Sequence, residues 1–367
     1  MKIAYMRYNI PIEMGTRGRS GGGTDQRDGI FQQLSNEGHQ IDIFSRVTGD
    51  TSSYNYGKIY QFDKKPTGYP VLIIENGPSN LMFTDKETGN PQIVDVCHQL
   101  LSYEGTVIYL QFDPKLPMVL NVDKYSSLWN EKTKSSNYPT GITTEDMIRN
   151  RRFVVCTYLH DIEYFKQVSI KYGRMGYWMV DNFYSVTCPR ADWKLGISKH
   201  VDNFLFYAGN ERGRLEKFTR FLGHGLCSVR VAGRWNDKIK DRFPNIYWMG
   251  TIPQYDVRDY LNKSVASISI VDKHMENGDF IGSRVFEVIQ SRCVLLLDSV
   301  QQKAISIIGS EYSVDTAEEM LDKIPVNYAK RKEILEDQWQ KVKKYGIFHR
   351  FGNEMTSIFK KEGIIYY

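Results

Sequence analysis

The sequence VASISIVD (265–272) is followed by KHMENGDFIG (273–282) and then by SRVFEVI (283–289). The first part is a short, apolar, β-rich run of the kind that is buried in a parallel sheet. The second part is polar and contains an Asn-Gly-Asp step, so it predicts a loop. The third part has the apolar spacing of a helix that begins near Gly282. Strand, loop and helix in this order form the repeating unit of an α/β protein.

Arg284 and Glu287 lie three residues apart and therefore share one face of that helix, near its N-terminus. A cation beside free backbone N–H groups is a natural seat for a diphosphate. A carboxylate one turn further on can accept both hydroxyls of a ribose. Asp272, at the carboxyl end of the strand, points into the same crevice. The alternative is an ordinary exposed i,i+3 ion pair, worth about 0.2–0.5 kcal/mol.

Composition limits the class of protein. The chain has 367 residues, which suggests two domains, and its 41% hydrophobic and 25% charged residues can build real cores. A net charge of +5 permits an anionic partner without requiring one. No apolar run reaches the roughly 18 residues of a membrane span. The cysteines are odd in number, scattered and without a C-x-x-C motif, so we expect a reduced intracellular protein without disulfides or a zinc site; they are Cys97, Cys156, Cys188, Cys227 and Cys293.

The first half opens as a doubly wound domain, with a strand at 2–6, a glycine-rich loop at 15–25, a helix at 26–37 and a strand at 40–44. The loop does not keep G-x-G-x-x-G spacing, so a dinucleotide site is disfavoured. It is either a loop that closes over a ligand, with Arg17 and Arg19 on phosphates, or a plain flexible loop.

A strand at 106–112 ends in Asp113-Pro114. A carboxylate at the tip of such a strand faces the ligand crevice and is a candidate general base, although Asp-Pro also starts ordinary turns. The rest of this half is predicted as follows: strands at 69–75 and 153–158, helices at 94–103 and 162–172, a polar insertion at 121–151, and a crossing between domains at 173–191.

The second half repeats the alternation. Strands are predicted at 203–209, 228–233, 246–250, 265–272 and 293–297, and helices at 215–222, 253–263, from 282, at 329–344 and at 354–361. Arg212 and Arg214 lie on one βα loop, and Arg284 with Glu287 on another. The fold class is therefore α/β, with two doubly wound, Rossmann-like domains facing across a cleft. The second carries a nucleotide-diphosphate site, and the first offers Asp113.

Four patches resemble, in the same order, the GT-B fold glycosyltransferases, and within them the DNA β-glucosyltransferases of T-even-type bacteriophages. They are YLQFDPKLP (109–117), YAGNERGR (207–214), MGTIP (249–253) and the stretch 271–287. Such enzymes move glucose from UDP-glucose onto 5-hydroxymethylcytosine in DNA. The resemblance implies an N-terminal acceptor domain (1–185), a UDP-sugar domain (186–340) and a C-terminal helix (341–367) that packs back on the first domain.

The resemblance also implies residue roles. Asp113 would be the catalytic base, Asp25 is the second choice, and the donor would be held by Gly209, Arg212, Arg214, Ile252, Asp272, Arg284 and Glu287. Ile252 would touch the uracil through its backbone, and Asp272 would bind the sugar. The sequence departs from the family at the glycine-rich loop, at Gln26 in place of an acidic residue, and at Thr251 in place of a lysine. These differences leave the sugar open between glucose and a pentose such as arabinose.

The implied partners are a UDP-sugar, with a loosely bound Mg²⁺ as an option, and double-stranded DNA with a flipped modified base. Phosphate contacts would come from Arg17, Arg19, Arg149, Arg151 and Arg152, although the last three also fit a solvated surface patch. The expected protein is a monomer without a membrane partner, in the cytoplasm of an infected bacterium. Two alternatives remain: a UDP-sugar glycosyltransferase with an already modified base or a non-DNA acceptor, and a non-catalytic nucleotide- or DNA-binding protein.

Overall fold

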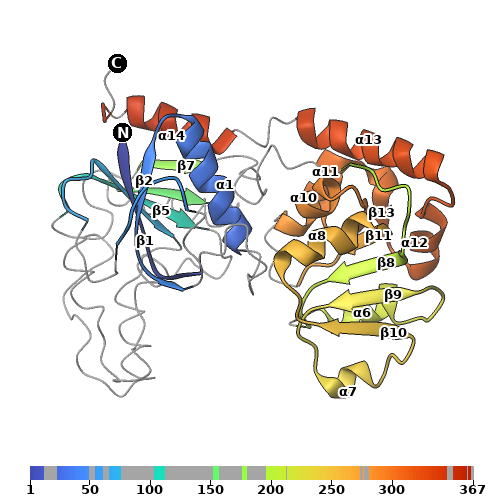
Figure 1. The fold of residues 1–367 in the computed structure, drawn as a ribbon. Helices are drawn as coiled ribbons and strands as arrows, with labels where there is room; N and C mark the ends of the chain where they lie inside the picture. Colours follow the sequence, from blue (N-terminus) through green and yellow to red (C-terminus); the bar gives the residue numbers. More distant parts are fainter. Residues whose placement is uncertain are drawn as a thin grey trace. The chain divides into compact units, whose positions relative to one another are not determined.

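A computed structural model describes most of the second half of the chain and a smaller part of the first (Figure 1). The described residues are 1–11, 23–48, 54–60, 66–75, 103–111, 152–156, 176–179, 196–211, 213–272, 276, 281–344, 350–361 and 363–364. Contacts divide the chain into two compact units. The first contains β1 to β7, the end of helix α1 (Gly23–Asn36) from Phe31 onward, and the last helix from Gly352 onward; the second contains α1 up to Ile30 and the elements from β8 to α13. The boundaries expected at residues 185 and 340 stay predictions. None of the described helices is both long enough and apolar enough to cross a bilayer.

The first unit contains a seven-stranded sheet in which every strand pairs in parallel with its neighbours, in the order β3-β2-β1-β4-β5-β6-β7. The strands are β1 (Lys2–Pro11), β2 (Gln40–Thr48), β3 (Ile59–Tyr60), β4 (Val71–Glu75), β5 (Thr106–Gln111), β6 (Arg152–Cys156) and β7 (Gly176–Met179). The order reverses between β1 and β4, as in a doubly wound fold. The predicted α/β class is confirmed.

Three details of this unit differ from the sequence predictions. Strand β1 runs to Pro11 rather than to residue 6, and α1 (Gly23–Asn36) begins inside the predicted glycine-rich loop. The segment 173–191 was expected to cross between domains, but it contributes β7, which pairs with β6. Four residues are too few to display a strand period, so the pattern missed it. The predicted helix at 162–172 and the insertion at 121–151 lie outside the described residues, as do residues 94–102 of the other predicted helix.

The C-terminal helix α14 (Arg350–Lys361) belongs to the first unit and lies beside α1 (Figure 1). The backbone N–H of Gly352 donates to Oε1 of Gln33 at 3.2 Å. Nε2 of His39 and Oγ1 of Thr356 form a buried hydrogen bond of 3.0 Å, and the His39 ring meets Phe359 edge-on with centroids 5.5 Å apart. The last helix is thus fixed by residues more than 300 positions earlier in the chain.

The second unit contains a six-stranded parallel sheet in the order β10-β9-β8-β11-β12-β13, again reversing beside its first strand. Its strands are β8 (Asn203–Ala208), β9 (Val229–Ala232), β10 (Ile246–Gly250), β11 (Ser264–Ser269), β12 (Val294–Asp298) and β13 (Ser313–Val314). Its helices are α6 (Leu215–Leu222), α7 (Asp237–Lys240), α8 (Gln254–Asn262), α10 (Ser283–Gln290), α11 (Gln302–Ile308), α12 (Ala317–Lys323) and α13 (Tyr328–Lys344), with a 3₁₀ turn at Ser310–Tyr312.

Two cores cover the two faces of this sheet. Alternate strand residues point to opposite faces, so Leu205 and Tyr207 join one core while Phe206 and Ala208 join the other. The first core contains buried side chains of α6 and α12, and the second contains those of α8, α10 and α11. Helices on both faces explain why β12 is buried along its whole length.

Helix α13 completes the sheet where β13 is too short to do so. Strand β13 pairs only with Leu297 and Asp298. Further along β12, the side-chain amide of Gln338 accepts from the N–H of Leu295 at 3.0 Å and donates to its carbonyl at 2.7 Å. The buried guanidinium of Arg331, on the same helix, donates to four backbone carbonyls, those of Ser198, Asn262, Ser264 and Arg292. The predicted helix at 329–344 is therefore a structural element of the second unit.

His39 predicts a dependence of stability on pH. Burial, together with the positive charge of the N-terminal amine, lowers the pKa of His39 from 6.5 to about 4 in the folded state. The unfolded chain therefore binds a proton between these values while the folded chain does not, so stability falls as pH drops through this window and rises with pH. We expect the melting temperature to fall between pH 6.5 and 4, and to fall less in His39→Gln, whose side chain cannot titrate. An equal decline in both proteins would contradict this assignment.

Candidate functional site

The site lies at the carboxyl ends of β8 and β11, which are neighbours where the strand order reverses. Arg214, the N-cap residue of α6, donates from Nε to the carbonyl of Ile270 at 3.2 Å. Its NH2 lies 3.9 Å from Oδ2 of Asp272. Gly213 is close enough that an added Cβ would lie 3.2 Å from Cβ of Asp272. The sheet therefore brings the predicted phosphate loop and the predicted sugar carboxylate into contact.

Arg284 and Glu287 form an ion pair in the first turns of α10. The i,i+3 ion pair of the alternative interpretation is present, but it is not an exposed pair, because Glu287 is only 4% exposed. Burial raises the pKa of the Tyr207 phenol at the end of β8, and the positive charges of Arg214 and Arg284 both oppose that rise. Both guanidinium groups therefore act on the same buried ring. Arg214 and Arg284 lie at the N-termini of α6 and α10, and permanent cations at helix N-termini favour a bound anion.

The loop after β8 is held in shape by the loop after β9. Three hydrogen bonds that involve a side chain connect them, from Trp235 Nε1 to the Gly209 carbonyl at 2.8 Å, from Arg234 N to Asn210 Oδ1 at 2.8 Å, and from Asn236 N to Glu211 Oε2 at 3.0 Å. A backbone hydrogen bond of 3.1 Å, from Glu211 N to the Arg234 carbonyl, is the fourth. The Trp235 ring packs on Phe218 of α6 with centroids 4.3 Å apart. Sequence reasoning missed Trp235. The Gly-Arg-Trp step that follows β9 was the available signal, but only the tertiary contact gives it a role.

Two glycines allow these loops to approach. Gly233 has φ of +139°, and a Cβ placed there would lie 2.1 Å from the carbonyl oxygen of Gly209. A Cβ on Gly209 would lie 2.5 Å from the Tyr207 hydroxyl. The N–H of Gly233 also donates to the carbonyl of Gly250 at 2.8 Å, so the end of β10 joins the same assembly. Half-buried Ile252 follows two residues later and packs against the second core.

The structure brings together five of the predicted donor residues, Gly209, Arg214, Asp272, Arg284 and Glu287, and places Ile252 after β10, two strands away from β8. The others cannot be compared. Arg212, Asp113, Arg17, Arg19, Arg149 and Arg151 lie outside the described residues, while Asp25 lies in α1 and Arg152 in β6 without described side chains. In the described part of the chain, no group of three or more His, Cys, Asp or Glu side chains is arranged to hold a metal ion.

The fold is that of the GT-B glycosyltransferases. The T4 phage β-glucosyltransferase in complex with its UDP-glucose substrate is similar over 98% of this chain and 99% of its own, with a TM-score of 0.64 and 20% identity. The same T4 phage enzyme with UDP and Mn²⁺ gives a TM-score of 0.65 at 20% identity and the same coverage. An α-glucosyltransferase in complex with UDP and a 13-mer DNA containing an HMU base gives 0.53 at 12% identity, over 99% and 98%. No protein-family model and no curated protein matches the sequence.

Gly233 and Gly250 offer a matched test of the loop assembly, since both have positive φ. Gly250→Ala should cost about 1 kcal/mol, because an added Cβ meets no described atom within 4 Å and only the backbone strain remains. Gly233→Ala should cost more than about 3 kcal/mol, because it adds a backbone collision with Gly209 to strain of about 1–3 kcal/mol. Urea unfolding midpoints would measure both; equal losses would contradict the close approach of the two loops.

Proposed function

We propose that this protein transfers a sugar from a UDP-sugar to the hydroxymethyl group of 5-hydroxymethylcytosine in DNA. The observation that carries the proposal is the convergence of Arg214, Asp272, Arg284 and Glu287 at the switch point of the second sheet. The fold shared with a T4 phage β-glucosyltransferase that binds UDP-glucose, and with an α-glucosyltransferase that binds UDP and DNA, supports the same function.

The donor half of this proposal follows from charge and geometry. A guanidinium group matches the spacing of phosphate oxygens and keeps its charge at every physiological pH, so Arg214 and Arg284 suit a diphosphate. Glu287 lies one turn into α10 and would accept the two ribose hydroxyls. Asp272 stands beside Arg214, so it would reach the sugar attached to the second phosphate. Ile252 would contact the uracil through its backbone.

In the proposed reaction the acceptor hydroxyl oxygen attacks the anomeric carbon of the sugar. The new carbon–oxygen bond forms as the bond to UDP breaks, the electron pair leaves with UDP, and the hydroxyl proton passes to Asp113. A single displacement inverts the anomeric configuration. The charge that gathers on the leaving diphosphate is stabilised by the arginines and the N-terminus of α10. The target base has to leave the DNA stack to reach such a site.

The acceptor side rests on residues that were proposed from the sequence. Arg17, Arg19, Arg149, Arg151 and Arg152 would contact DNA phosphates on either side of the flipped base. Binding through phosphates releases counterions, so affinity for duplex DNA should fall steeply between about 50 and 200 mM salt. A loosely bound Mg²⁺ would add charge to that of the arginines when UDP leaves. The proposed location is the cytoplasm of an infected bacterium, with the protein acting as a monomer.

One experiment tests the reaction. Duplex DNA containing 5-hydroxymethylcytosine is incubated with the protein and UDP-glucose or UDP-arabinose, and plain-cytosine DNA is the control. The DNA is then digested to nucleosides, and their masses are measured by mass spectrometry. A hexose or pentose on the modified base alone would support the proposal and identify the donor. If UDP is released only with another acceptor, the protein is a glycosyltransferase that does not act on this base. If UDP is released with no acceptor tested, the protein is a non-catalytic binding protein.

Asp113 should be essential for turnover but not for donor binding. Asp113→Asn keeps the size of the side chain and removes the base, so kcat should fall about 10²–10⁴-fold. The dissociation constant of UDP, measured by calorimetry, should stay within about twofold, because the donor site lies on the other unit. Full activity of Asp113→Asn would place the base elsewhere, and Asp25→Asn would then be the next variant.

Arg214 should bind the phosphates of the donor rather than its nucleoside. A hydrogen bond to a charged group contributes about 1.5–3 kcal/mol, so Arg214→Met should weaken UDP about 10–100-fold. Uridine, measured by competition, should bind the variant as it binds the natural protein. Lys330→Met is the matched control, because it removes an exposed cation that pairs with Glu333 on α13. Equal losses for UDP and uridine would show that Arg214 acts on the fold of the site instead.

A further inference from the structure

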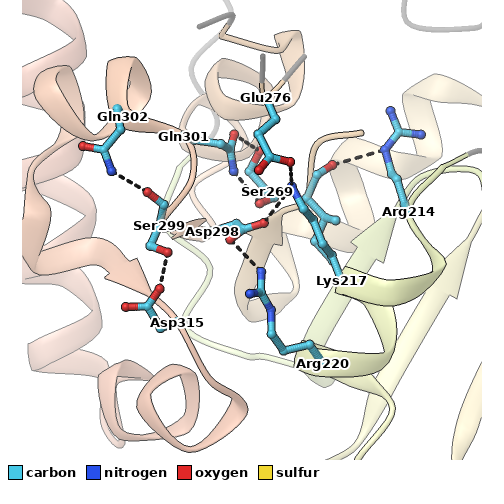
Figure 2. Close-up of polar contacts among 11 residues, drawn as sticks. Arg214, Lys217, Arg220, Ser269, Glu276, Asp298, Ser299, Gln301, Gln302 and Asp315 are labelled. Atoms are coloured by element: carbon cyan, nitrogen blue, oxygen red, sulfur yellow. Dashed lines mark hydrogen bonds and ion pairs between the residues drawn. The ribbon is translucent and has the colours of Figure 1, made fainter. Parts of the chain in front are cut away.

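Three basic residues, Arg214, Lys217 and Arg220, follow one stripe of α6 at three-residue spacing. Each faces a carboxylate from the carboxyl edge of the sheet. Arg214 lies near Asp272, while Lys217 and Arg220 both reach Asp298 at the end of β12 (Figure 2). The stripe therefore connects the helix that follows β8 to the segments that follow β11 and β12.

Asp298 is the carboxylate that Lys217 and Arg220 share. Its side chain is fully buried, and a buried charge is costly unless it is paired. Arg220 donates from NH2 to Oδ1 at 2.8 Å, and Nζ of Lys217 lies 3.4 Å from Oδ2. Either cation alone would still neutralise the carboxylate. Removing one of them should therefore leave the fold intact.

Lys217 differs from Arg220 in having a second acidic partner. Its Nζ donates to Oε2 of Glu276 at 2.8 Å, and the backbone N–H of Glu276 donates to the carbonyl of Asp272 at 3.0 Å. Figure 2 shows Lys217 between Glu276 and Asp298, with Arg214 one turn away along the helix. Lys217 is only 14% exposed, whereas Arg220 is 40% exposed and lies over the ring of Phe221.

We propose that Lys217 is a positioning residue for the UDP-sugar: it holds the segment of Asp272 and Glu276 against α6, and so sets the spacing between Asp272 and Arg214. The inference rests on the proposed function of the same site. Lys217 does not touch the donor in this arrangement; it acts through Glu276 on Asp272. The ion pair of Lys217 with Glu276 depends on geometry as well as on charge. Variants that keep the charge and variants that remove it therefore distinguish this contact from a general electrostatic effect on the ligand.

The test compares the two cations that share Asp298. We expect Lys217→Met to weaken UDP-glucose about tenfold by calorimetry, in the range typical of coupled residues in one network. Arg220→Met removes the other partner of Asp298 and should leave that dissociation constant within about twofold, even where it lowers the melting temperature. Lys217→Arg should recover most of the lost affinity.

Glu276→Gln separates positioning from electrostatics. Removing a negative charge near an anionic ligand would tighten binding through the field alone, whereas loss of the ion pair with Lys217 should weaken it about tenfold. The double variant Lys217→Met with Glu276→Gln should be no worse than either single variant, because both break the same connection.

The outcomes are distinguishable. If the natural protein binds UDP-glucose while Lys217→Met binds it equally well, or Glu276→Gln binds it more tightly, the positioning role is overturned and the proposed function stands. Equal losses in Lys217→Met and Arg220→Met would also overturn it, since both would then act only by anchoring α6. If the natural protein fails to bind UDP or UDP-glucose, the proposed function is overturned and this inference falls with it.

Discussion

The parallel pairing of β8 with β11, while β9 pairs on the other side of β8, is the constraint on which the site depends. It places the carboxyl ends of two strands next to each other although Arg214 and Ile270 are 56 residues apart in the chain. The connections after the two strands lead to α6 and α10 on opposite faces of the sheet, and ligands of such sheets bind at this switch point. Arg214 follows β8 while Arg284 follows β11, so only the pairing of the strands brings the two guanidinium groups to the same edge of the sheet.

Contacts within the chain order the end of the sheet around Arg214. Arg214 donates from Nε to Ile270 and from NH1 to the carbonyl of Asn210, so the plane of its guanidinium group is set by backbone atoms on both sides. The carbonyl of Gly209 is held in turn by the indole of Trp235. Because side chains and loops that are already ordered lose little entropy on binding, such a site gains affinity without additional contacts. Gly209 and Gly233 contribute because a Cβ on either would collide with a neighbouring atom of this assembly.

Sequence patterns predicted the parts of the fold that repeat and missed the parts that depend on one tertiary contact. Helix α6 has the predicted limits, and Arg284 and Glu287 lie together on α10, because apolar periodicity and three-residue spacing are local properties. Strands β3 and β13 have two residues each, too few for any period. The missed helix α12 did carry a signal, since Thr316 caps the N–H of Glu319. The roles of Trp235 and Lys217 follow only from contacts with residues that are distant in the sequence.

The buried ion pairs near the switch point contribute more to the positions of side chains than to the free energy of unfolding. Replacing a buried ion pair by apolar residues of similar volume is often neutral or stabilising, so the pairs of Glu287 and Asp298 need another reason to exist. One pair lies on α10 and the other at α6, and these helices pack on opposite faces of the sheet. An apolar contact at either place would tolerate sliding, whereas a paired buried charge has one low-energy geometry. Asp298, paired with Lys217 and Arg220, therefore connects α6 to the end of β12, while the pair within α10 sets the orientation of Arg284 and Glu287 relative to each other.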